Sequence, residues 1–433
     1  MGAASRLPAC DGGGYLRVKI LVIRNEPPWP LCYGGRLHCY ELCRRLAERH
    51  HLRMIVERPC ESDEWPFNFE CQVARGSRLD SHEVDLEADE NQPGRLERYF
   101  GINMGFVREV VRFTRQWQPE IVIGMNYQSL ACLAHLKQVP TICDLQDDEV
   151  LHRWRELWHG RATSKWNDLK CLLAVGLFQR KYIRKVDAVT VLSDVDQRVC
   201  RLVTGHRRIE CIPHGVDCEH YTPSDQPVDE NRAIFWGGLT FGPNLSAILY
   251  FVEKVWPVVL AKKPQMRFSI MGRGHSPLLD RLKYIPGIDL IGYVDDIRPH
   301  VADAALVVVP MISGGGIKNK IMEAWAMGKA VLCTPRALGN LPGIHRQNVW
   351  IAKSPRALAE GLVTLTDDKE LRDALGRAGR QTALEHCSWD RAAEQLERLC
   401  KDVLLAKNPV RFDVDLASSQ VKNESKSNEV SLK

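Results

Sequence analysis

The stretch that decides the fold spans residues 313–327 and reads SGGGIKNKIMEAWAM. An apolar run at residues 305–309 precedes it and predicts a buried strand. Three glycines then permit a tight turn, and apolar residues at helical spacing follow from about Lys318 until Gly328 ends the pattern. A strand, a glycine loop and a helix start that carries Lys318 and Lys320 are typical of an anion-binding site. The alternative is an ordinary βα turn with solvated lysines, and the spacing is not that of a P-loop.

The composition predicts a globular protein of two domains. The chain has 433 residues, of which 45% are hydrophobic and 26% charged, and its formal net charge is +5. No apolar run is long enough to span a bilayer, and the start of the chain lacks a signal-peptide pattern, so we expect a cytoplasmic protein. The 15 cysteines are scattered without a CxxC pair or a zinc spacing, which favours reduced thiols.

The first half of the chain predicts an α/β domain. Residues 17–24 indicate its first strand, and Gly34 and Gly35 open a helix. A glycine pair in the first βα loop lies where α/β proteins bind ligands, although a tight turn explains it equally well. After a short strand, residues 144–149 read DLQDDE. Four acids in six residues suggest either a divalent-metal site or an ordinary helix N-terminus.

Residues 151–185 form a basic segment that contains three tryptophans. Such a segment suits peripheral contact with an anionic membrane at the inner face, and a core helix with solvated arginines is the other interpretation. We do not expect nucleic-acid binding, because no recognised binding module accompanies the charge.

The second half predicts a second α/β domain. A strand runs into Gly237 and Gly238, and a later strand ends in a loop with Arg273. Residues 355 to about 385 have a helical pattern, and a last amphipathic helix begins at residues 388–390.

Several of these motifs resemble one enzyme family. The segment GGGIKNKIMEAWAMGKAVL resembles the nucleotide-sugar-binding segment of retaining glycosyltransferases of family 4, especially the sugar transferases of exopolysaccharide gene clusters, with their G-I-x-N-K-x-x-E-A-M-A-M-G. PHGVD at residues 213–217 resembles the P-N-G-V-D of the family, and the segment around Val294 resembles its G-x-V-x-D. The resemblance extends from Val18 to about Leu399, with the motifs in family order.

The resemblance implies the GT-B fold, with two Rossmann-like α/β domains, a deep interdomain cleft and a C-terminal helix that crosses back to the first domain. We expect an acceptor-side domain at 1–222, a nucleotide-sugar-binding domain at 232–387, the cross-over helix at 388–405 and a disordered tail at 409–433.

The resemblance also implies a hexosyltransferase-like, retaining enzyme of polysaccharide or glycoconjugate synthesis. Its partners are a nucleotide-diphosphate sugar donor and a saccharide or lipid-linked acceptor, without a metal or a further cofactor. Lys318 and Lys320 are expected to stabilise the departing diphosphate, and Asp147 to contact the sugar or acceptor. The expected donor-binding residues are Glu323 at the ribose, with Gly315, Gly316, Ile317, Asn319, Arg273, Val294, Gly237, Gly238, Gly34 and Gly35.

Two departures from the family pattern leave other functions open. Gly315 replaces the first of two family glutamates, and the usual Arg/Lys pair after Gly238 has no counterpart. The alternatives are a non-catalytic GT-B module that binds nucleotide sugars and a sugar-nucleotide epimerase.

Overall fold

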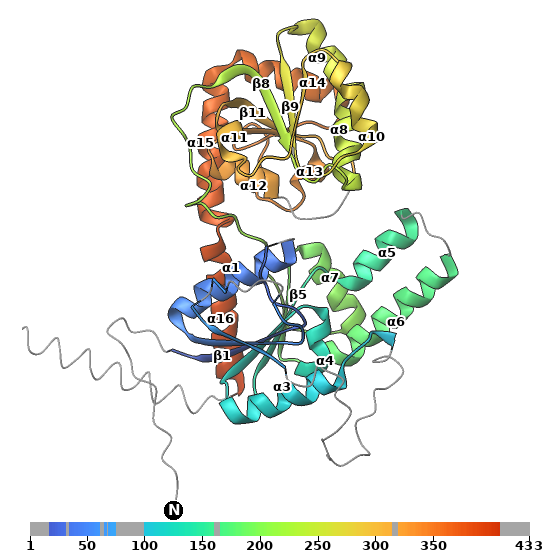
Figure 1. Cartoon of the computed structure of the whole chain (residues 1–433), viewed down its shortest axis with the longest axis vertical. Coiled ribbons are helices and arrows are strands. Elements are labelled where there is room, and N and C mark those ends of the chain that lie inside the picture. Colours follow the sequence, from blue (N-terminus) through green and yellow to red (C-terminus); the bar gives the residue numbers. More distant parts are fainter. Residues whose placement is uncertain are drawn as a thin grey trace, which may run out of the picture. The chain divides into compact units, whose positions relative to one another are not determined.

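A computed structural model of the chain describes residues 17–31, 34–60, 65–66, 68–74, 99–159, 165–313 and 319–407. The chain divides into two compact units, Met1–Pro213 with Ala393–Lys433, and His214–Ala392. Each unit contains a parallel sheet with helices packed against it (Figure 1). The expected tail at 409–433 lies outside the described residues.

The first unit is built on a seven-stranded parallel sheet in the order β3-β2-β1-β4-β5-β6-β7. Its strands are β1 (Lys19–Arg24), β2 (His51–Val56), β3 (Glu70–Val73), β4 (Ile121–Met125), β5 (Thr141–Gln146), β6 (Ala188–Val191) and β7 (Ile209–Cys211). Its helices are α1 (Gly34–Arg49), α3 (Met104–Trp117), α4 (Leu130–Leu133), α5 (Glu149–His159), α6 (Lys165–Ile183) and α7 (Asp194–Thr204), with the 3₁₀ turn η2 (Tyr127–Ser129). The strand order reverses between β1 and β4, which is where open parallel sheets bind ligands.

The second unit is built on a six-stranded parallel sheet in the order β10-β9-β8-β11-β12-β13. Its strands are β8 (Asp229–Trp236), β9 (Arg267–Met271), β10 (Ile288–Gly292), β11 (Ala304–Val309), β12 (Ala330–Cys333) and β13 (Trp350–Ile351). Its helices are α8 (Gly242–Lys254), α9 (Trp256–Lys262), α10 (Pro277–Asp280), α11 (Arg298–Ala302), α12 (Asn319–Ala326), α13 (Pro335–Leu338), α14 (Pro355–Asp367) and α15 (Lys369–His386), with the 3₁₀ turn η3 (Arg281–Tyr284). Here the order reverses between β8 and β11.

Apolar strands covered on both faces explain this layering. Every residue of β4 and of β11 is buried, as expected for parallel strands between helices. In β8, Ala233 and Phe235 join one core cluster while Ile234 and Trp236 join another, so successive side chains point to opposite faces of the sheet. The apolar run at 305–309 is therefore the buried strand that the sequence predicted.

The boundary between the units differs from the expected domain limits. The sequence placed the end of the first domain at residue 222, but residues from His214 onward pack with the second unit. One cause is Arg380, whose guanidinium donates to the carbonyl oxygens of Cys218 and Tyr221 at 3.1 and 2.9 Å. The last helix, α16 (Trp389–Lys407), contains the second boundary, because its residues from Ala393 onward belong to the first unit.

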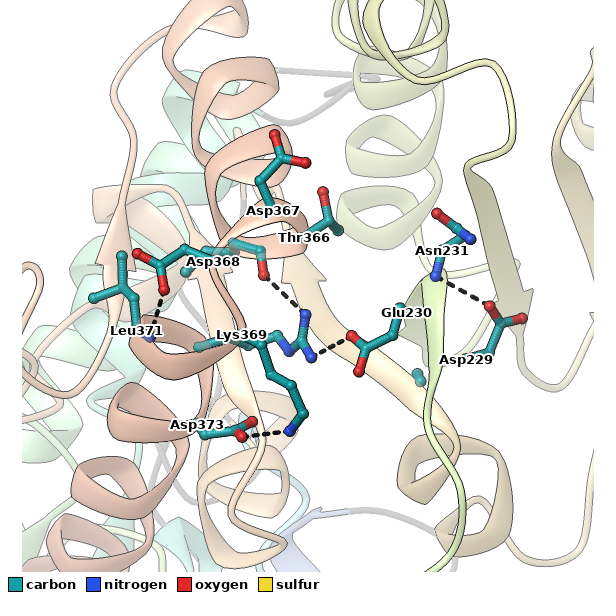
Figure 2. A network of polar contacts seen from close by, with 12 residues as sticks. Asp229, Glu230, Asn231, Thr366, Asp367, Asp368, Lys369, Leu371 and Asp373 are labelled. Atoms are coloured by element: carbon teal, nitrogen blue, oxygen red, sulfur yellow. Dashed lines mark hydrogen bonds and ion pairs between the residues drawn. The ribbon is translucent and has the colours of Figure 1, made fainter.

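Charged side chains at the amino end of β8 form a network of ion pairs, shown in Figure 2. Arg372 of α15 is buried, pairs with Glu230 and donates to the carbonyl oxygen of Leu365 at 3.1 Å. Lys369 pairs with Asp373 one turn further along the same helix, at 2.6 Å. The Arg372–Glu230 pair joins α15 to the end of the sheet opposite to the carboxyl ends of the strands, whereas the Lys369–Asp373 pair lies within the helix.

None of the described helices is by itself long and apolar enough to cross a membrane; α8 and α9 pass that test only as a pair, with a 41° bend between them.

Candidate functional site

The loops after β8 and β9 are in backbone contact at the carboxyl edge of the second sheet. Gly237 N–H donates to Met271 O at 3.0 Å, and Leu239 N–H donates to Arg273 O at 2.8 Å. A Cβ atom on Gly272 would lie 1.7 Å from Gly237 O, and Gly237 and Gly272 have φ values of 146° and 151°. Only glycine fits these two positions, so the backbone geometry of this edge is fixed by the sequence.

Lys320 lies against this glycine loop. A Cβ atom on Gly237 would lie 2.8 Å from Lys320 Cε and 2.9 Å from Lys320 Nζ. Lys320 Nζ donates to Asn244 Oδ1 at 3.2 Å and lies 5.2 Å from the centre of the Phe235 ring. Asn244 Nδ2 in turn donates to Gly238 O at 3.0 Å, which orients the amide so that its oxygen faces the ammonium group. The first turn of α12 thus carries a cation to the point where the strand order reverses.

Glu323 lies three residues after Lys320 in α12 and contacts the end of β8. Its Oε2 accepts a hydrogen bond from Trp236 Nε1 at 2.8 Å. Desolvation of the carboxyl group raises the pKa of Glu323, while the indole hydrogen bond and the charge of Lys320 oppose that shift. The Trp236 indole thus fixes the position of one oxygen of the Glu323 carboxyl group.

Other predicted donor-binding residues lie at the same edge or outside the described part of the chain. Arg273 is exposed in the loop after β9, with its guanidinium 4.8 Å from the centre of the Tyr293 ring. Val294 is partly buried and packs against the core cluster that contains Trp236. Asn319 begins α12, and among the described residues its buried Oδ1 has no hydrogen-bond partner. The predicted residues that lie outside the described residues are Gly315, Gly316, Ile317 and Lys318.

In the first unit, Gly34 and Gly35 begin α1 as the sequence predicted. The carbonyl oxygen of Gly35 accepts hydrogen bonds from Arg24 Nη1 at 2.9 Å and from Gln146 Nε2 at 3.3 Å. The helix start is thereby tied to the carboxyl ends of β1 and β5, beside the point where this strand order reverses.

Of the acidic cluster at residues 144–149, Asp144 is buried within β5, and the two aspartates that follow the strand differ in exposure. Asp147, the predicted contact for the sugar or acceptor, is exposed. Asp148 is buried and accepts hydrogen bonds from Leu151 N at 2.9 Å and from Gln179 Nε2 at 3.1 Å. Burial raises the pKa of Asp148 to about 6. Asp148 thus caps α5, whereas Asp147 is the acid of this cluster that faces solvent.

Two residues that the sequence interpretation missed end neighbouring strands of the first sheet. Asn126 after β4 has φ 143° and ψ 170°, and Gln146 at the end of β5 has φ 66°. Asn126 Nδ2 donates to Asn25 Oδ1 across the reversal point between β1 and β4. Strained non-glycine residues gather at functional sites, so we include Asn126 and Gln146 in the candidate site of the first unit.

Among the described residues, no group of three or more His, Cys, Asp or Glu side chains is placed to hold a metal ion.

Comparisons with known proteins match both halves of the chain to glycosyltransferases. Residues 34–220 match the family described as Glycosyltransferase Family 4, and residues 230–368 match the family described as Glycosyl transferases group 1. The two matches together span most of the chain, and with the fold they support a family-4-like glycosyltransferase.

Two curated relatives are glycosyltransferases. A GDP-mannose-dependent monoacylated alpha-(1-6)-phosphatidylinositol monomannoside mannosyltransferase of Corynebacterium glutamicum is 26% identical over 51% of this chain and 63% of its own length. The chain thus matches slightly less than two thirds of that relative. An uncharacterised glycosyltransferase of Methanocaldococcus jannaschii is 21% identical over 89% of this chain and 98% of its own length.

Solved structures confirm the fold. Sucrose-phosphate synthase of Thermosynechococcus elongatus superposes with a TM-score of 0.65 at 16% identity, over 90% of this chain and all of that protein. HepE of Anabaena, solved with UDP-glucose, superposes with a TM-score of 0.60 at 14% identity, over 89% of this chain and all of that protein. The expected pair of Rossmann-like domains of the GT-B fold is therefore present.

Proposed function

We propose that the protein is a retaining, metal-independent glycosyltransferase that moves a hexose from a nucleotide-diphosphate sugar to a saccharide or lipid-linked acceptor. The observation that carries this proposal is the position of Lys320 Nζ beside Gly237 and Asn244, at the strand reversal where such sheets bind nucleotides. The names of two relatives support the donor class, since one depends on GDP-mannose and the other was solved with UDP-glucose.

The donor's diphosphate is assigned to Lys320 and to the N-terminus of α12, where a cation and unpaired backbone N–H groups favour negative charge. Lys318, Gly315, Gly316 and Ile317 precede that helix start in sequence and are proposed to complete the diphosphate site. Glu323 Oε1 is assigned to a ribose hydroxyl, because Oε2 is held by Trp236. Gly238, Asn319, Arg273 and Val294 line the same edge of the sheet.

In the reaction, the bond between the anomeric carbon and the diphosphate oxygen breaks, and the acceptor oxygen bonds to the same face of that carbon. The acceptor's proton passes to the departing diphosphate, so no side-chain base is required. The protein's contribution is electrostatic stabilisation of the leaving group. Asp147 and the Gly34–Gly35 helix start of the first unit are assigned to the sugar or acceptor side.

A thermal-shift panel of UDP, GDP, ADP, TDP and CMP, with EDTA and then with a divalent metal, tests the donor site. A ligand that binds only the folded state raises the melting temperature. We expect one nucleoside diphosphate to stabilise the whole chain in EDTA. No shift with any nucleotide would favour the non-catalytic module, and a shift that requires metal would contradict metal independence.

The catalytic role of Lys320 is tested with Lys320→Ala and the donor identified by that panel. Loss of one well-placed donor to a developing oxyanion typically costs roughly 10²–10³ in rate. We expect that loss in turnover with an unchanged melting temperature; near-wild-type turnover would refute the role. Product analysis with and without an acceptor separates a transferase from a sugar-nucleotide epimerase, which needs no acceptor.

A further inference from the structure

One face of α6 is both apolar and exposed. Trp166, Leu173 and Leu177 are 64%, 61% and 60% exposed. With Lys170 they are spaced by four, three and four residues, so they form one line along the helix. Trp154 of α5, the helix that packs against α6, is also half exposed. A continuous line of large apolar groups on one helix face, unlike single exposed apolar residues, marks an interaction surface.

The opposite face of α6 already anchors the helix to its own unit. Val175, Phe178, Tyr182 and Ile183 are buried. Phe178, Tyr182 and Ile183 belong to the core cluster of the first sheet. The core of the first unit therefore does not use Leu173 or Leu177, and both are exposed among the described residues.

The exposed line continues into positive charge. Arg180 and Lys181 follow Leu177 by three and four residues and are exposed. Lys170 lies within the apolar part, with its Nζ 5.4 Å from the centre of the Trp166 ring. Asp168 is the one acidic residue of α6, and it does not fall on this line. Leu173, Leu177, Trp166, Lys170, Arg180 and Lys181 are called the α6 face below.

We propose that the α6 face binds the surface of an anionic lipid bilayer. Tryptophan and leucine insert at the boundary between headgroups and acyl chains, and lysine and arginine stems extend from there to the phosphates. Charge decides between a bilayer and a second copy of this chain. A symmetric dimer through this face would bring its basic residues together without acidic partners, whereas anionic headgroups neutralise them.

The proposal is independent of the donor and the reaction, so its test needs neither. The full-length wild-type chain is sedimented with vesicles of phosphatidylcholine alone and with vesicles that also contain phosphatidylserine. The charge variant is Lys170→Gln, Arg180→Gln and Lys181→Gln, and the apolar variant is Leu173→Ser and Leu177→Ser. Matched controls on exposed residues of the second unit are Lys262→Gln, Lys353→Gln and Arg377→Gln, and Leu278→Ser and Tyr284→Ser.

We expect the wild type and both controls to bind phosphatidylserine vesicles, and to bind less as salt rises. One basic residue near an anionic surface contributes about fivefold to partitioning, so the charge variant should bind on the order of a hundredfold more weakly. The apolar variant should lose on the order of tenfold or more, with an unchanged melting temperature. The proposal would be overturned if the wild type did not bind the vesicles, or if both variants bound them as strongly as the wild type does. A dimer seen by light scattering that the apolar variant dissociates, without vesicle binding, would overturn it in favour of self-association.

Discussion

The hydrogen bond from Trp236 to Glu323 gives a prediction that can be worked out in detail. The substitution Trp236→Phe keeps an aromatic ring at the end of β8 and removes the Nε1–H donor. Glu323 Oε2 then loses the contact that measures 2.8 Å. A hydrogen bond to a charged group contributes about 1.5–3 kcal/mol, and the smaller ring adds a cavity cost of about 1 kcal/mol. We therefore expect a loss of roughly 2–4 kcal/mol of stability at neutral pH.

The loss should depend on pH with a definite sign. In the folded wild type, desolvation raises the pKa of Glu323 above its ordinary value of 4.5, and the Trp236 hydrogen bond limits that rise. A carboxyl group whose folded pKa is raised destabilises the folded state as pH increases from 4.5 through the folded pKa. Removing the donor raises the folded pKa further. The difference in melting temperature between wild type and Trp236→Phe should thus widen as pH rises through the folded pKa of Glu323 in the wild type, which lies above 4.5.

Calorimetry of the whole chain across this pH range measures the difference, and a Glu323→Gln background supplies the control. A neutral amide cannot titrate, so in that background the effect of Trp236→Phe should be smaller and independent of pH. An equal cost of Trp236→Phe at pH 4.5 and pH 8 in the wild-type background would refute the assignment of this bond to an ionised carboxylate.

Three further predictions use neighbouring features. Gly237→Ala should displace Lys320, because the added Cβ would lie 2.9 Å from its Nζ, and should lower turnover by at least tenfold. The control is Gly242→Ala, whose Cβ meets no atom within 4 Å; it should keep wild-type kinetics. Asp148→Asn should raise the melting temperature relative to wild type as pH increases from 3.8 to about 6, by the equivalent of up to about 3 kcal/mol. The reason is that burial disfavours the ionised carboxyl group, and Gln179 can turn its amide to accept a hydrogen bond from asparagine. An unchanged pH dependence of melting would contradict this. Arg372→Ala should destabilise the fold by about 3 kcal/mol, because it leaves Glu230 without its ion-pair partner. Turnover per folded molecule should not change, since the Arg372–Glu230 pair lies at the opposite end of the sheet from Lys320. A selective loss of turnover would be the contrary result.

The sequence predicts the elements that have strong periodicity or glycine punctuation. The strand before the glycine loop, the helix after it and the helix start at Gly34 all appear in the structure. The helical pattern at residues 355–385 also appears, as the two helices α14 and α15. Asp368 causes the break, because its side chain accepts a hydrogen bond from Leu371 N–H and caps a new helix. Apolar periodicity alone cannot reveal a cap inside a run of helix-forming residues.

The candidate site could be predicted only in part, because most of its geometry comes from contacts between distant residues. Lys320 and Glu323 are visible in sequence, but their partners Asn244 and Trp236 lie 76 and 87 residues away. Asn126 is another case, because no pattern in the neighbouring residues predicts its unusual backbone conformation. Asparagine adopts positive φ more readily than most residues, and that preference was the one available signal.

Contacts with glycine backbone explain how the second unit fixes the position of the Lys320 ammonium group at the candidate site, although lysine is a flexible side chain. Gly237 and Gly272 allow the loops after β8 and β9 to touch, and Asn244 is hydrogen-bonded to that backbone through Gly238 O. Lys320 Nζ is then located by Asn244 Oδ1 and by the glycine surface under its Cε. At the other end of α12, the Ala326 carbonyl oxygen accepts from Arg380 at 2.5 Å, so both ends of the helix are tied to the fold. Lys320 is therefore held in a fixed position, which is the condition under which one charge contributes strongly to a transition state.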